Sequence, residues 1–154
     1  MRGNTQIISA LNEGLIRELT GINQYSIHRA ILAVQEYPKL IEYIDERIAD
    51  ERKHYDMLAE RIRFLEGVPV VGSLNPVNVG EDIMSIHSFD LTAEYDAIQK
   101  YNETIQLCLQ VGDSGTRGIL ETILSDEEDH ARDLEAQLIQ IAQMTTSNYL
   151  SAKL

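Results

Sequence analysis

One arrangement of glutamate and histidine occurs twice in this chain at a fixed separation. Glu-x-x-His begins at Glu51 and again at Glu127, 76 residues later. One glutamate upstream of each copy keeps the same separation, because Glu18 and Glu94 are also 76 residues apart. Several apolar positions follow the same offset, so the second half of the chain is an approximate copy of the first. Two copies that face each other would be related by an approximate twofold axis through a shared core.

Apolar residues recur every three or four positions along four long segments, which is the period of helices with one buried face. We expect these helices at about residues 4–34, 39–65, 82–111 and 116–144. Pro38 and Gly112 mark short turns after the first and third helices, so each of these pairs is antiparallel. Residues 66–81 are rich in glycine and proline and are numerous enough to travel the length of a bundle. The sequence therefore predicts an all-α, ferritin-like four-helix bundle with one long crossover.

The repeated glutamates and histidines fall on the apolar stripes of the four predicted helices. A carboxylate in a bundle core is costly unless it is paired or bound to a metal. One glutamate from each of two helices, with one Glu-x-x-His from each of the other two, is the pattern of di-iron and di-manganese carboxylate proteins. Oxygen and imidazole ligands together favour iron or manganese over copper or structural zinc. The alternative is that all six residues are exposed charges on the surfaces of the helices. This would require the predicted helix face to be wrong for every one of them. The predicted ligands are Glu18, Glu51, His54, Glu94, Glu127 and His130.

Length, charge and cysteine content limit the other classes of protein. The 154 residues fit one domain, residues 1–154. The net charge of −12 argues against binding to nucleic acid, because there is no basic surface to release phosphate counterions. Cys108 is the only cysteine, which excludes disulfides within the chain and Cys-x-x-Cys sites. No apolar run approaches the roughly 20 residues that span a bilayer, and we expect a cytoplasmic protein without a membrane partner.

The chain resembles the bacterioferritins along its whole length. The resemblance rests on the segments MRGNTQII, LTGINQY, DERKH, RIRFLEGVP, NVGED, DEEDH and NYLSAKL. It implies that the six predicted ligands form a ferroxidase centre, in which Glu51 and Glu127 bridge two irons and each histidine binds one. It also implies a short fifth helix at about residues 146–154, which is too short to be stable alone. Members of this family assemble into hollow shells of twenty-four subunits around an iron mineral.

The resemblance assigns roles to a few further residues. Tyr25 would be an electron donor near the irons; the alternative is a core tyrosine with a hydrogen-bonded hydroxyl. Its counterpart in the repeat, Tyr101, is expected to be structural. Glu46 and Asp50 lie at the family's inner-surface iron site, with a solvated acidic face as the alternative.

The family's haem position differs in this chain. A methionine from each of two subunits holds the haem iron in the family, and the matching residue here is Arg52. A protonated guanidinium has no lone pair to offer iron. We therefore expect no bis-methionine haem b in a homomeric shell. The remaining histidines, His28 and His87, match no ligand spacing and are expected at the surface or at an interface.

These observations together predict an iron-storage ferroxidase. The protein would oxidise Fe(II) with dioxygen or hydrogen peroxide and pass ferric product to the cavity of its shell. One alternative is a peroxidase of the rubrerythrin or manganese-catalase type, which the lack of a rubredoxin-like Cys-x-x-Cys tail weakens. Another is a shell subunit that works with a haem-bearing paralogue. A DNA-protecting mini-ferritin is disfavoured, because its metal site lies between subunits and lacks the doubled Glu-x-x-His.

Overall fold

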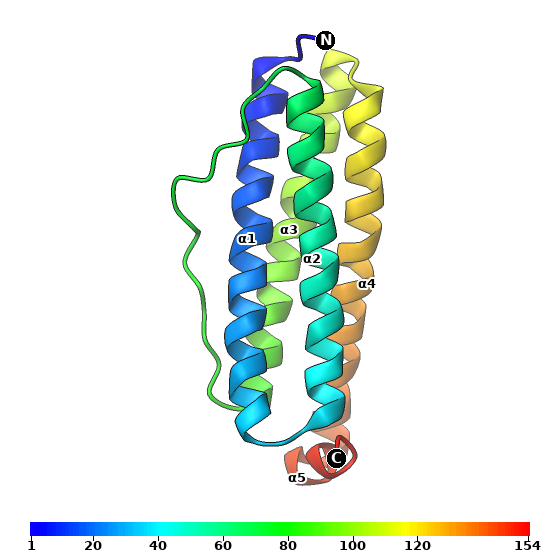
Figure 1. The fold of residues 1–154 in the computed structure, drawn as a ribbon. Coiled ribbons are helices and arrows are strands. Elements are labelled where there is room, and N and C mark those ends of the chain that lie inside the picture. The colour runs from blue at the N-terminus through cyan, green and yellow to red at the C-terminus, as the bar shows by residue number, and fades with distance from the viewer.

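The computed structural model describes all 154 residues and consists of helices and connections without any strand (Figure 1). The helices are α1 (Thr5–Val34), α2 (Pro38–Phe64), α3 (Ile83–Val111), α4 (Ser114–Met144) and α5 (Thr146–Ser151). The first four stand side by side as a bundle, and α5 lies across one end of it. The prediction of an all-α, ferritin-like bundle is therefore confirmed. The fourth helix begins slightly earlier than expected and the fifth ends before the C-terminus.

Local sequence signals set the ends of the long helices. Side-chain oxygens of Asn4, Asp82 and Asp113 accept hydrogen bonds from first-turn backbone N–H groups of α1, α3 and α4. Pro38 occupies the first turn of α2, where its missing N–H group is not needed. Gly112 ends α3 in the left-handed region with φ of 76°. These caps fix the register of each helix, and with it the face on which the ligand residues lie.

Residues 65–82 form the crossover, which runs along the outside of α1 from one end of the bundle to the other (Figure 1). As a result, α2 and α3 run in the same direction. Four backbone N–H groups of the crossover donate to side chains of α1, in the pairs Val70–Asn12, Asn75–Thr20, Asn78–Gln24 and Gly80–His28. At the end of the crossover a Cβ on Gly80 would lie 2.4 Å from the backbone nitrogen of Ile86, so only glycine fits there. The crossover is thus fixed to the bundle along its length.

The apolar core is divided into two clusters by a polar layer. The larger cluster includes Leu11, Leu58 and Leu120, and the smaller includes Leu32 and Ile44. Along each long helix the buried glutamates, together with His54 on α2 and His130 on α4, lie between the residues of the two clusters. The polar layer therefore lies between two apolar clusters. No helix combines the length and apolar character that crossing a membrane would require.

The prediction that His28 and His87 lie at a surface or an interface is wrong, because both are buried. His28 Nδ1 lies 2.9 Å from Asp90 Oδ1, and His28 Nε2 accepts a hydrogen bond from the Gly80 N–H group. His87 Nε2 lies 3.0 Å from the hydroxyl of Tyr149, which joins α3 to α5. Each histidine is paired with residues from other elements. Spacing along its own helix could not reveal these partners.

Candidate metal centre

The six predicted ligands converge in the polar layer, from all four long helices. Each is buried, with between 0% and 5% of its surface exposed. A glutamate and a histidine three residues apart share one helix face. The two residues of each pair, on α2 and on α4, therefore both point into the polar layer. Their ligand atoms form two groups, and within each group these atoms lie within 4.8 Å of one another. The groups are Glu18, Glu51, His54 and Glu127, and Glu51, Glu94, Glu127 and His130. Two carboxylates, Glu51 and Glu127, therefore belong to both groups.

Both imidazoles present Nδ1 to these carboxylates. His54 Nδ1 lies 3.3 Å from Glu127 Oε1 and 3.5 Å from Glu18 Oε2. His130 Nδ1 lies 3.1 Å from Glu127 Oε2 and 3.5 Å from an oxygen of Glu94. Neither Nδ1 atom has a hydrogen-bond partner, and neither do both oxygens of Glu127 and one oxygen each of Glu18 and Glu51. Buried polar atoms are rarely left unpaired in a folded protein. A pair of cations would satisfy all of them, so these residues fit a two-metal site.

The outer nitrogen of each histidine is held by an aspartate from the opposite helix pair. His54 Nε2 lies 3.0 Å from Asp126 Oδ2, and His130 Nε2 lies 3.2 Å from Asp50 Oδ2. The aspartate of each Asp-Glu-x-x-His therefore contacts the histidine of the other copy. Such carboxylates orient a metal-binding imidazole and fix its tautomer. Asp126 was not predicted from the sequence, although the repeat relates it to Asp50. Glu46 is exposed and its carboxylate lies near Arg47.

Two tyrosines hold the remaining glutamates in the same crossed manner. Tyr25 on α1 donates its hydroxyl hydrogen to Glu94 on α3, and Tyr101 on α3 donates to Glu18 on α1. Both phenols are buried. Burial, and then the nearby carboxylates, raise the pKa of each tyrosine well above its ordinary value. Tyr101, expected to be structural, thus makes the same contact as Tyr25, and the 76-residue offset could have revealed it.

The carboxylates of the centre do not ionise independently. Burial raises the pKa of Glu51 well above its usual range, and the charges of Glu127 and Glu18 raise it further. Burial and the charge of Glu127 also raise the pKa of Glu94, to about 7, against the opposing effect of the nearby imidazole of His130. Burial and the charge of Glu18 also act to raise the pKa of Glu127, but the imidazoles of His130 and His54 close to its oxygens hold that pKa below the usual value. Without a cation, the centre therefore retains protons on part of its carboxylates.

The histidines take up protons for the complementary reason. Burial opposes the charge of His54, but the adjacent carboxylates of Glu127 and Glu18 outweigh it and raise the pKa of His54 to about 11. The same balance, with Glu127 and Glu94 as partners, raises the pKa of His130 to about 9. The metal-free centre thus carries protons where its ligand atoms would bind cations. Metal binding must displace them and release protons to solvent.

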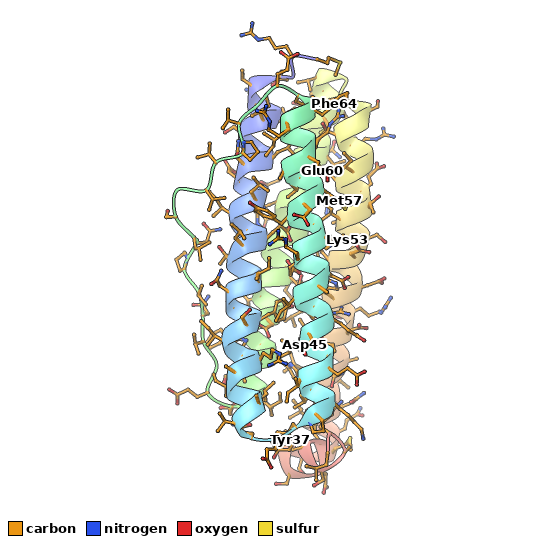
Figure 2. The ribbon with its side chains drawn as sticks, in the orientation of Figure 1. Tyr37, Asp45, Lys53, Met57, Glu60 and Phe64 are labelled. Atoms are coloured by element: carbon orange, nitrogen blue, oxygen red, sulfur yellow. The ribbon has the colours of Figure 1, made fainter.

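Arg52 lies outside the centre, on the outward side of α2. Its side chain is 64% exposed and pairs with Asp56 at 3.3 Å. The guanidinium also lies over the ring of Tyr55, 5.4 Å from the centroid. Figure 2 shows the neighbouring side chains Lys53 and Met57 on the same helix. The structure therefore places a cation on this surface.

Comparisons with known proteins agree with the ferritin-like architecture. Residues 8–144 match the model of the ferritin-like domain. A bacterioferritin of Brucella melitensis is 34% identical, over 97% of this chain and 92% of that protein. A bacterial ferritin of Synechocystis sp. is 36% identical, over 100% of this chain and 99% of its own. A bacterioferritin of Streptomyces coelicolor is 35% identical, over 98% of this chain and 90% of its own.

Proposed function

The chain belongs to the ferritin-like family, as a bacterioferritin, and we propose that it oxidises Fe(II) at the six-residue centre and stores the ferric product. It is an iron-storage protein and a ferroxidase. The observation that carries the finer assignment is the pair of overlapping ligand groups, whose buried atoms lack other partners. Four carboxylates carry four negative charges, which two divalent cations balance.

Each ligand takes its role from the group to which it belongs. Glu51 and Glu127 occur in both groups and would bridge the two ions. Glu18 and His54 complete one position, which we call the Glu18 position. Glu94 and His130 complete the other, the Glu94 position. Carboxylates and imidazoles suit iron in both oxidation states better than they suit copper or structural zinc.

Bound iron supplies one electron per ion to dioxygen or hydrogen peroxide, and the protein's residues prepare the site for this transfer. The two aspartates behind the histidines keep Nδ1 directed at the ions. Oxygens of Glu51 and Glu127 that lack hydrogen bonds are free to change between bridging and terminal binding. Hydrogen peroxide needs only the two electrons of the irons, whereas dioxygen can accept four. With dioxygen, Tyr25 is placed to act as a further donor, which would lose one electron to the oxidant and its hydroxyl proton to Glu94.

We place this ferroxidase in a shell of twenty-four subunits, either of this chain alone or together with a haem-bearing paralogue. The resemblance and the bacterioferritin relatives support an oligomeric shell. A lone free cysteine, the buried Cys108, suits the reducing cytoplasm. The proposed partners are ferrous iron, dioxygen or hydrogen peroxide, and further copies of the chain.

Anaerobic titration with Fe(II), followed by a pulse of oxidant, tests the assignment. We expect two irons per subunit in the rapid phase, with loss of that phase in Glu127→Ala and in His130→Ala. Either substitution removes a ligand, but it also removes one charged group from a crowded buried site. Circular dichroism should therefore show an intact fold. Glu121→Ala, at an exposed carboxylate that pairs with Arg117, is the control and should keep the rapid phase. Rapid oxidation at the wild-type rate in both ligand variants would refute the assignment.

A further inference from the structure

A cavity of about 290 Å³ leads from the surface to the centre between α1 and α3. Its outer rim includes exposed residues of the crossover and of α3, among them Asn75, Asn78 and Asp96. Its inner end is lined by Glu51 and Glu94. No other member of the six-residue set lines it. The cavity therefore opens on the Glu94 position and on one bridging carboxylate.

The exposed fractions of the four glutamates follow the same division. Glu51 is 5% exposed and Glu94 is 3% exposed, whereas Glu18 and Glu127 are each 0% exposed. The Glu18 position is thus sealed from this side. Because the helices and ligands are related by an approximate twofold axis, some local difference between the halves must cause the inequality.

Gly21 supplies that difference. It lines the cavity and is half-buried on α1, and a Cβ at this residue would lie 3.2 Å from Glu51 Oε2. The counterpart of Gly21, 76 residues later, is Ala97, which lines the same cavity and is 5% exposed. By the twofold relation we expect the Cβ of Ala97 on the side of Glu127, the carboxylate that belongs to both groups and that the cavity does not reach. One methyl group therefore distinguishes the open half from the closed half.

We propose that Gly21 makes the two metal positions unequal: metal ions enter and exchange through this cavity at the Glu94 position, and reach the Glu18 position only from there. This inference rests on the proposed function, because it takes the six residues as ligands. Arg17 and Asp96 at the rim form an ion pair with Nε and Oδ2 3.1 Å apart, so their charges offset each other. Attraction for a cation then comes from the carboxylates at the inner end.

The opposite face of the bundle offers the competing route. A hollow of about 200 Å³ between α2 and α4 is lined by Asp50, Asp126 and His130, among others. The two imidazoles close this side, because their Nε2 atoms face the aspartates and their Nδ1 atoms face the centre. Entry here would require His54 or His130 to leave its aspartate and turn aside. The cavity beside Gly21 needs no such rearrangement.

Co(II) binding to the assembled protein tests the inference without iron oxidation. In Gly21→Ala we expect Co(II) uptake and its removal by chelator to slow by about tenfold, since an added methyl group in a packed site raises the barrier to passage. The number of Co(II) ions bound at equilibrium should not change. Gly118→Ala adds the same methyl group on α4, where nothing lies within 4 Å of the new Cβ, and should keep the wild-type rates. Ala97→Gly removes the counterpart methyl and should not slow uptake.

Brief Co(II) soaks of crystals, read by anomalous scattering, test the order of filling directly. The Glu94 position should fill first, and the Glu18 position should follow. Parallel filling, or filling of the Glu18 position first, would overturn the inference while leaving two bound ions and the proposed function in place. Unchanged rates in Gly21→Ala, or a lower affinity with an unchanged uptake rate, would also overturn it. No Co(II) at either position would overturn the proposed function, and the inference with it.

Discussion

Four of the six residues of the centre are held by a side chain from the other half of the chain. These contacts join Asp126 to His54, Asp50 to His130, Tyr25 to Glu94 and Tyr101 to Glu18. The two remaining residues, Glu51 and Glu127, keep oxygens with no hydrogen bond. The proposed terminal ligands are therefore fixed in place, and the proposed bridging ligands keep the freedom that a change of oxidation state requires.

The aspartates behind the histidines should control metal affinity. In Asp126→Ala, His54 loses the acceptor for Nε2, and we expect Co(II) affinity at the Glu18 position to fall by about 10- to 100-fold. Asp50→Ala should have the same effect on the Glu94 position through His130. Asp129→Ala is the control, because Asp129 pairs with Arg132 and contacts neither imidazole. Optical Co(II) titrations measure these affinities, and wild-type binding in both variants would show that the aspartates do not orient the ligands.

Arg52 should prevent the binding of haem between two methionines in a shell of this chain alone. A thioether sulfur ligates haem iron, whereas a guanidinium offers no lone pair. The purified homomeric protein reconstituted with haem should show no low-spin spectrum with two sulfur ligands, and Arg52→Met should gain one. Lys53→Met places methionine one residue further on α2, at another exposed side chain, and should not gain it. Such a spectrum from the unchanged protein would contradict the assignment of this position.

At the scale of the elements, the crossover is a strap held by side chains of α1. Its backbone N–H groups reach Gln24 and His28, and both of these residues also contact the buried Asp90 of α3. Three elements therefore meet in one buried hydrogen-bond network beside the centre. Because the strap also forms the rim of the cavity, its position and the access to the centre depend on the same contacts.

Loss of His28 should loosen this strap. In His28→Ala the Gly80 N–H group and one oxygen of Asp90 lose a buried partner, so we expect the free energy of unfolding to fall by about 1–3 kcal/mol. Hydrogen exchange of the Gly80 amide should become faster than in the wild type. Ser26→Ala, at an exposed position of α1, should change stability by no more than about 0.5 kcal/mol. Unaltered exchange at Gly80 in His28→Ala would mean that other contacts hold the strap.

At the scale of the whole molecule, the buried charges couple stability to pH and to metal. The bundle encloses its ligands between two apolar clusters, so without a cation the charge of these ligands is balanced by the protons that they bind. Large apolar side chains also lie on the outside, among them Phe64 and Ile139, with 56% and 55% exposed. Figure 2 shows Phe64 near the end of α2. Such residues suit a subunit that is further buried in a shell.

The metal-free protein should lose stability as the pH rises from about 6.5, the ordinary pKa of histidine, through about 9. Folding raises the pKa of His130 to about 9 and that of His54 to about 11, so the folded state binds more protons than the unfolded state in this range. The stability that this extra proton binding contributes is complete below the pKa of the unfolded state. It is lost as the pH rises through the pKa of the folded state. Urea unfolding with a chelator present, repeated across this pH range, measures how the free energy of unfolding changes with pH.

Loading with Co(II) should reverse this dependence on pH, because the cation takes the place of the protons. His130→Ala should weaken the slope of the metal-free protein between these pH values. Metal-free stability that stays level or rises over the same range would contradict the proton uptake expected of the two histidines.

The sequence alone determined the helices, their order and the set of six residues that meet in the core. The helical period can be read within one segment, and the 76-residue repeat can be read by comparing the two halves of the chain. Glu18 and Glu94 could therefore be placed on inward faces without knowledge of their partners. Caps and turns likewise act within a few residues of the helix ends. The long crossover then predicted the ferritin-like arrangement, in which the second and third helices run in the same direction.

Only the tertiary structure decided which side chains support that set and from which side it can be reached. The burial of His28, the crossing of the aspartates to opposite histidines and the cavity beside Gly21 all join residues from different helices. Contacts of this kind depend on distances between elements, which spacing along one helix does not encode. The exact repeat of the ligands even conceals the inequality between Gly21 and Ala97, because a single methyl group matters only where the helices pack closely enough to exclude it.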